Sequence, residues 1–154
     1  MLKAETRTRI EALIERYPER RSALIPALKL AQREAGYLSA EVLCELAEIF
    51  RLTPNEVHEV ASFYTMLFRK PVGKYVIWVC TNISCMLCDA EAILAHLESR
   101  LGIRPGETTP DGRFTLMEAE CLASCGTAPV VQINDDYYEN LTLERLDRIL
   151  DGLT

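Results

Sequence analysis

Residues 75–85 read YVIWVCTNISC, a short apolar run that ends in one cysteine and reaches a second cysteine in the following loop. The part 75–79 is rich in β-branched and aromatic residues, which favours a strand buried on both faces. From position 89 to position 101 the apolar residues recur at helical spacing, so we predict a helix there. A buried strand followed by an amphipathic helix begins a β-α-β unit, and this segment therefore assigns the second half of the chain to an α/β arrangement.

The sequence after residue 101 completes that unit. Further strands are predicted at 114–117 and 129–133, and a turn at 134–136 leads the second of them into a hairpin with 137–138. Thr142 is a candidate N-cap for a last helix. From residue 75 the predicted order is therefore β-α-β-β-α.

The first half of the chain shows apolar residues at helical spacing throughout, which predicts four helices. The second has Ser22 as a candidate N-cap and Gly36 as a candidate terminator, and the third opens at Ser39. Residues 53–56, TPNE, form a capping box with Pro at the first helical position, which marks the start of the fourth helix. The apolar run 63–68 that leaves this helix suits either core packing or a docking surface.

A break in the pattern at residues 71–73, PVG, separates the two halves. We therefore predict an α+β chain of two domains, a helical bundle over 1–70 and an α/β domain over 71–154.

Composition excludes several classes of function. The 154 residues can bury a real core, and 17 Lys and Arg against 23 Asp and Glu give a net charge of −6. An acidic chain offers no electrostatic surface for nucleic acid and is repelled by an anionic membrane. No apolar run approaches the ~20 residues that cross a bilayer, and the first residues do not resemble a signal peptide. We expect a cytoplasmic chain without membrane insertion.

Six cysteines are the chemically informative residues, and five of them lie in the second half. In a reducing compartment, clustered cysteines indicate metal ligands or redox groups more than disulfides. We expect the isolated one, in the third predicted helix, to be a small buried hydrophobe. The six are Cys44, Cys80, Cys85, Cys88, Cys121 and Cys125.

Two cysteine pairs follow two predicted strands. Cys80 and Cys121 end the strands, and Cys85 and Cys125 follow each in the loop. Such corners lie at the same edge of the sheet in a β-α-β unit, so four thiolates can converge there and hold a [2Fe-2S] cluster, in which each iron takes two sulfur ligands. The small and polar residues of both loops can aim backbone N–H groups at the sulfur atoms and stabilise negative charge.

Spacing alone leaves other arrangements open. Four cysteines in two pairs also suit structural zinc. Cys80, Cys85 and Cys88 match the opening of the plant-type ferredoxin spacing, which would make Cys88 a ligand. A catalytic thiol would require a nearby base, and the chain has only His58 and His96.

The residues around both pairs resemble a known family. The stretches 80–87, CTNISCML, and 120–129, ECLASCGTAP, are similar to the thioredoxin-like [2Fe-2S] subunit of bacterial NADH:quinone oxidoreductase, the respiratory complex I. The stretches 25–28, IPAL, 32–38, QREAGYL, and 56–64, EVHEVASFY, resemble the same family, so the similarity covers nearly the whole chain.

This resemblance implies a thioredoxin-like second domain and an electron-carrying role, with one [2Fe-2S] cluster held by Cys80, Cys85, Cys121 and Cys125. It implies FMN and NADH on a larger partner subunit, further peripheral-arm subunits, and a place on the cytoplasmic arm of a membrane-bound complex. The chain would then belong to an NADH dehydrogenase only as a subunit, with no substrate chemistry of its own.

Alternatives remain beside the resemblance. Related subunits serve NAD-linked hydrogenases and formate dehydrogenases, and the local signature does not separate these complexes. A structural zinc adaptor is a different class. So is a disulfide reductase, which the spacing of Cys85 and Cys88 permits.

Two positions depart from the family, which usually has Gly where this chain has Asp89 and Ala123. A side chain at either position can crowd the loop beside the cluster. We predict that the Asp89 carboxylate lowers the cluster's reduction potential.

Overall fold

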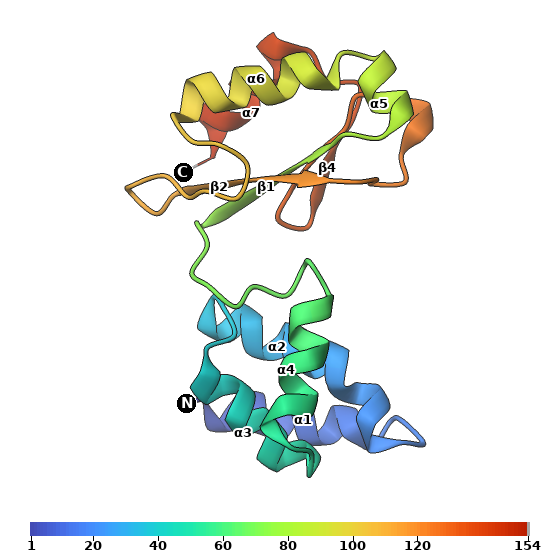
Figure 1. Ribbon diagram of the computed structural model, residues 1–154, viewed down its shortest axis with the longest axis vertical. Helices are drawn as coiled ribbons and strands as arrows, with labels where there is room; N and C mark the ends of the chain where they lie inside the picture. The colour runs from blue at the N-terminus through green and yellow to red at the C-terminus, as the bar shows by residue number, and fades with distance from the viewer. Residues whose placement is uncertain (154) are drawn as a thin grey trace. The chain divides into compact units, whose positions relative to one another are not determined.

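Helices form the first of two units, Met1–Pro71 and Val72–Thr154, into which the computed structural model divides (Figure 1). The structure describes residues 1–153. As predicted, Ser39 caps the third helix by accepting the N–H of Val42 at 3.4 Å, and the Thr53 and Glu56 side chains form the capping box of the fourth. The helical elements are α1 Ala4–Ile14, the 3₁₀ turn η1 Arg20–Ala23, α2 Leu24–Ala35, α3 Ala40–Phe50 and α4 Pro54–Phe63.

The predicted cap at Ser22 is wrong. The N–H of Ser22 donates to the carbonyl of Glu19 at 3.0 Å and closes the turn η1, so α2 begins one residue later, at an N-cap Ala23 without a side-chain bond. Gly36 ends α2 as predicted, in the left-handed region with φ of 80°.

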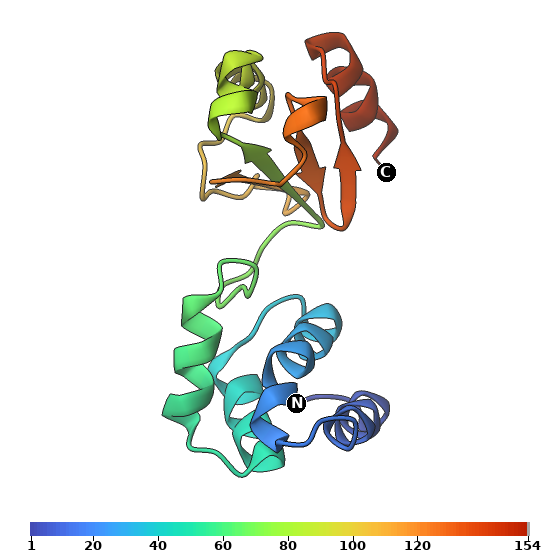
Figure 2. The same cartoon turned by 90° about the vertical axis from the view of Figure 1, so that its right-hand side faces the viewer.

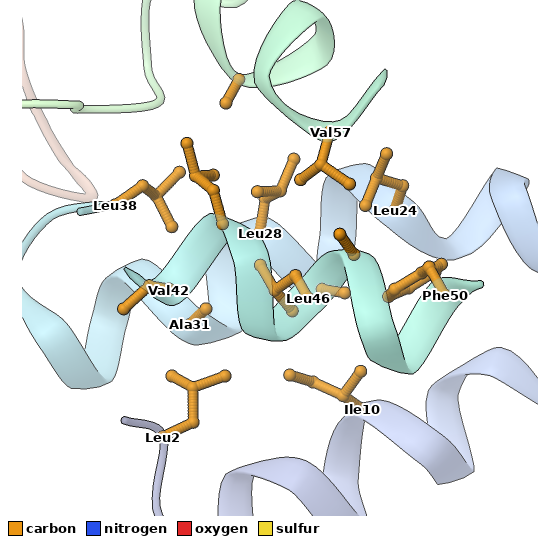
Figure 3. Packing of buried hydrophobic residues seen from close by; sticks show 14 of the residues in the cluster. Leu2, Ile10, Leu24, Leu28, Ala31, Leu38, Val42, Leu46, Phe50 and Val57 are labelled. Atoms are coloured by element: carbon orange, nitrogen blue, oxygen red, sulfur yellow. The ribbon is translucent and has the colours of Figure 1, made fainter. Parts of the chain in front are cut away.

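The core of this unit is apolar, and two carboxylates hold the start of the chain against it. Figure 3 shows Leu28 of α2 and Leu46 of α3 among the packed side chains, and both are completely buried. The buried Glu45 carboxylate accepts the N–H of Leu2 at 2.9 Å and pairs with Arg7, while Glu34 accepts the N–H of Lys3 at 2.7 Å. The N-terminal segment therefore closes one side of the core.

The apolar run 63–68 at the end of α4 contains both buried and exposed residues, so neither core packing nor a docking surface accounts for all of it. Leu67 is buried in the core, whereas Phe63 is 79% exposed and Met66 44% exposed. Core packing thus accounts for only part of this segment.

A four-stranded mixed sheet in the order β2-β1-β3-β4 organises the second unit. β1 runs parallel to β2 and antiparallel to β3, and β3 forms the predicted hairpin with β4. Helices α6 and α7 cover the same face of this sheet (Figures 1 and 2). The elements are β1 Tyr75–Cys80, α5 Ile83–Leu87, α6 Ala90–Leu101, β2 Phe114–Ala119, the 3₁₀ turn η2 Cys125–Thr127, β3 Val131–Ile133, β4 Asp136–Tyr138 and α7 Leu143–Gly152.

The fold of the chain is thus α+β, as predicted, with helices first and a mixed sheet second. Among residues 1–153 no helix is both long and apolar enough to cross a membrane.

Candidate metal centre

The ends of β1 and β2 place two cysteine-bearing loops side by side. Because these strands are parallel, Cys80 lies opposite Ala119, and Cys121 follows two positions beyond the end of β2. The N–H of Thr81 donates to the carbonyl of Ala119 at 3.0 Å, and the Asn82 amide donates to the carbonyl of Glu120 at 3.0 Å. The sheet edge therefore joins the two loops, as the spacing predicts for a β-α-β corner.

The first cysteine pair is buried beneath these loops. Cys80 is 2% exposed and Cys85 1% exposed, in a small cluster with Ala90 and Val130. We expected Cys85 in a loop, and this is wrong. It lies in the short helix α5, which turns its thiol inward. This pair is therefore shielded from solvent by protein.

The second pair faces solvent. Cys121 and Cys125 are both exposed, and Cys125 opens the turn η2. A group held by all four cysteines would thus have a buried side and a side close to the protein surface.

Each buried thiol is affected by a cysteine of the second pair. Burial raises the pKa of Cys80, but N–H groups of Asn82 and Leu122 and the thiols of Cys85 and Cys121 outweigh it, so this pKa lies below its ordinary value. Burial, the bond to Cys80 and the charges of Cys80 and Cys125 raise the pKa of Cys85 to about 11. The pKa of Cys80 thus depends on Cys121, and the pKa of Cys85 depends on Cys125.

Backbone N–H groups point at the sulfur atoms, as the small residues of the loops led us to expect. The N–H of Ala123 donates to the Cys121 sulfur at 3.2 Å, and the N–H groups of Asn82 and Leu122 donate to Cys80. Such donors stabilise thiolates, the form in which cysteine binds a metal.

The remaining cysteines lie outside this group. Cys88 is exposed at the C-terminal end of α5, where its N–H donates to the carbonyl of Cys85 at 3.0 Å. Cys44 is exposed on α3, so the expectation of a buried thiol is wrong. The buried face of α3 contains residues 42, 43, 46, 47 and 50, and helical geometry turns position 44 away from it.

Both histidines contact charged side chains rather than a cysteine. His96 contacts Asp147 of α7 at 2.7 Å, and the His58 ring lies 3.5 Å from the guanidinium of Arg69. Neither arrangement supplies a base to a cysteine.

The structure gives the two departures from the family a physical meaning. Asp89 and Ala123 both have left-handed backbone, with φ of 62° and 57°. Glycine adopts this conformation without a steric cost, whereas a residue with a Cβ is strained there. Glycine at either position, as the resemblance to the family implies, would therefore suit the backbone of this chain.

One set of contacts beside the cysteines was missed by sequence analysis. The Glu139 carboxylate, from the segment between β4 and α7, binds the hydroxyls of Ser124 and Thr127 on either side of Cys125. Both hydroxyls stand out in the sequence as polar loop groups, but nothing in the sequence connects them with Glu139.

The donor set suits two irons. A [2Fe-2S] cluster takes two thiolates at each iron, and the chain presents two pairs from two adjacent loops together with N–H donors.

Comparison with known proteins indicates the same kind of cofactor. The model of the family "Thioredoxin-like [2Fe-2S] ferredoxin" matches residues 10–154. A subunit of the NADH-quinone oxidoreductase of Rhizobium meliloti (strain 1021) is 52% identical over 146 residues, which cover 95% of this chain and 87% of that protein. Subunit 2 of the NADH-quinone oxidoreductase of Thermus thermophilus is 45% identical over 147 residues, which cover 94% and 81% of the two chains.

A solved structure is also similar. The NAD+-reducing [NiFe]-hydrogenase in the air-oxidized state matches with a TM-score of 0.73 and 28% identity, over 82% of this chain and 22% of that one. The chain thus spans only about a fifth of the hydrogenase chain that it resembles.

Proposed function

The chain belongs to the thioredoxin-like [2Fe-2S] ferredoxin family, and we propose that Cys80, Cys85, Cys121 and Cys125 hold its cluster in an NADH:quinone oxidoreductase. The observation that carries this assignment is the parallel pairing of β1 with β2, which starts both cysteine loops at one sheet edge. The effect of Cys121 on the pKa of Cys80 and the effect of Cys125 on the pKa of Cys85 support the same grouping.

When bound, a [2Fe-2S] cluster accepts or releases one electron at a time. The part of this chain is to hold the four thiolates and to stabilise the charge that an added electron brings. The N–H groups of Asn82, Leu122 and Ala123 serve that purpose at the sulfurs of Cys80 and Cys121. No substrate chemistry is assigned to the chain itself.

The chain is a subunit of a multi-subunit oxidoreductase, and we propose that its neighbour is the larger FMN- and NADH-binding subunit. A flavin reduced by hydride transfer can pass its electrons singly only to a one-electron acceptor. The exposure of Cys121 and Cys125 would leave one side of the cluster close to such a neighbour. We further propose contacts with other peripheral-arm subunits and a place on the cytoplasmic arm of the complex.

A second candidate is the equivalent subunit of an NAD-linked hydrogenase, which the likeness to the solved hydrogenase favours. The fold suits both complexes. Purification of the native complex discriminates between them, because a hydrogenase of that type contains nickel and an NADH:quinone oxidoreductase does not.

Metal analysis of anaerobically purified protein tests the site. We expect about two irons per chain and negligible zinc. Each of the four variants Cys80→Ser, Cys85→Ser, Cys121→Ser and Cys125→Ser should lose most of its iron, while Cys88→Ser and Cys44→Ser retain it as matched controls. One zinc without iron would favour the adaptor instead, and loss of iron in Cys88→Ser would overturn the assignment of ligands.

A further inference from the structure

The loop 121–128, called here the second ligand loop, needs support from outside itself. It carries Cys121 and Cys125 at the surface and includes the strained Ala123. Inside the loop, the N–H of Thr127 donates to the carbonyl of Ser124 at 3.1 Å and closes a single 3₁₀ turn. One short turn does little to fix the direction of two exposed thiols.

The support comes from one carboxylate oxygen. Oε1 of Glu139 accepts the Ser124 hydroxyl and also the Thr127 hydroxyl, the latter at 2.7 Å. These two hydroxyls lie 2.8 Å apart and stand on either side of Cys125 and Gly126. The Thr127 hydroxyl also lies 3.1 Å from the Ser124 carbonyl, but each hydroxyl has one proton to give, and a charged carboxylate is the stronger acceptor and can take both.

Glu139 is itself held in place. Its own carbonyl accepts the Arg145 guanidinium from α7, and the next N–H along the chain, that of Asn140, donates to the carbonyl of Thr127 at 2.7 Å. The segment 139–140 is therefore hydrogen-bonded to the second ligand loop through both a side chain and the backbone. The hydroxyls of Ser124 and Thr127 lower the pKa of Glu139, so the carboxylate is charged at neutral pH.

We propose that Glu139 is a positioning residue of the metal centre: it fixes Cys125 through Ser124 and Thr127 and places a negative charge beside the cluster. This inference rests on the proposed function. A fixed loop keeps the Cys125 thiolate at its iron, which slows loss of the metal. A nearby negative charge disfavours the added electron and lowers the reduction potential.

Iron release to a chelator, redox titration and the EPR spectrum of the reduced protein test the proposal on the full chain. Glu139→Ala removes both hydrogen bonds and the charge, and we expect about tenfold faster iron release and a changed EPR line shape. Glu139→Gln retains an acceptor without the charge, so we expect iron release near the wild-type rate and a higher potential. The matched control is Asp136→Asn, which neutralises an exposed carboxylate of the same hairpin and should change neither the rate of iron release nor the potential.

The double variant Ser124→Ala/Thr127→Val provides a second test in case Glu139→Ala fails to fold. It should release iron faster than wild type, because both hydroxyl groups that donate to Glu139 are lost. A wild-type potential in Glu139→Gln together with a wild-type rate of iron release in the double variant would overturn the proposal. Wild-type protein without iron would instead overturn the proposed function, and this inference with it.

Discussion

Ala123 has a left-handed backbone in the second ligand loop, with φ of 57°. Its Cβ is strained in this conformation, and glycine would not be. We predict that Ala123→Gly raises the free energy of unfolding by about 0.5–1 kcal/mol, since the relief of strain exceeds the added entropy of the unfolded chain. Urea unfolding measures the change.

The matched control is Ala128→Gly in the same loop. Ala128 has an ordinary φ of −62°, so its replacement relieves no strain; it adds entropy to the unfolded chain and removes a methyl group that packs against the cluster of Cys80 and Cys85, and both effects lower stability. Equal effects of the two substitutions would show that backbone strain at Ala123 does not matter.

Asp89 also has a left-handed backbone, but its expected effect is on potential. Its carboxylate is exposed just before α6, close in sequence to Cys85, and disfavours an added electron nearby. We predict a higher potential in both Asp89→Gly and Asp89→Asn than in wild type, with a small rise because water screens an exposed charge. The Asn variant separates the effect of the charge from the effect of the backbone. A redox titration in which the potential of either variant is equal to or lower than that of wild type contradicts the prediction.

At the scale of elements, α6 and α7 are joined by a charged cluster. Asp147 of α7 contacts His96 at 2.7 Å and Arg100 at 2.6 Å, and Arg100 also pairs with Asp151. The hydrogen bond to His96, followed by the charges of His96 and Arg100, lowers the pKa of Asp147 below its ordinary 3.8. The folded state therefore holds this carboxylate in its charged form.

A lowered pKa fixes the direction of the pH effect. The contribution of Asp147 to stability is complete above its pKa in the unfolded chain and disappears as pH falls through its lower folded value. We predict that Asp147→Asn flattens the fall of the unfolding free energy below about pH 4, measured by urea unfolding across pH. Asp151→Asn should change that slope less, because Asp151 is 71% exposed. A slope equal to wild type in Asp147→Asn would refute the prediction.

The elements differ in how well the sequence predicts them. α3 and α4 begin at Ser39 and Thr53, where a side-chain cap marks the boundary. α5 escaped prediction because five residues are too few for a helical pattern, and the side chain of its N-cap Asn82 does not cap the helix but donates to the carbonyl of Glu120. The cysteine spacing predicted the paired corners, since parallel strands bring their ends together. Glu139 could not be predicted, because it reaches Ser124 and Thr127 only through the folding of the β3–β4 hairpin.

At the scale of the whole molecule, each unit has its own apolar core. One contains α1 to α4 with Leu28 at its centre, and the other contains the sheet, α6 and α7 with Leu146. The division into a helical domain over 1–70 and an α/β domain over 71–154 remains a prediction. It requires that the two parts unfold as separate cooperative transitions.

Removing the metal offers a way to test this division. All four proposed ligands lie in Val72–Thr154, and a metal stabilises only the folded unit that binds it. We predict that chelation of iron lowers the midpoint of one calorimetric transition and leaves the other unchanged. Core variants identify the transitions. Leu146→Ala should lower the midpoint of the iron-sensitive transition and Leu28→Ala that of the other, because each substitution reduces the free energy of unfolding of its unit by about 2–5 kcal/mol. If chelation or either variant moved both transitions together, the chain would be a single cooperative unit, and the iron would stabilise the helices as much as the sheet.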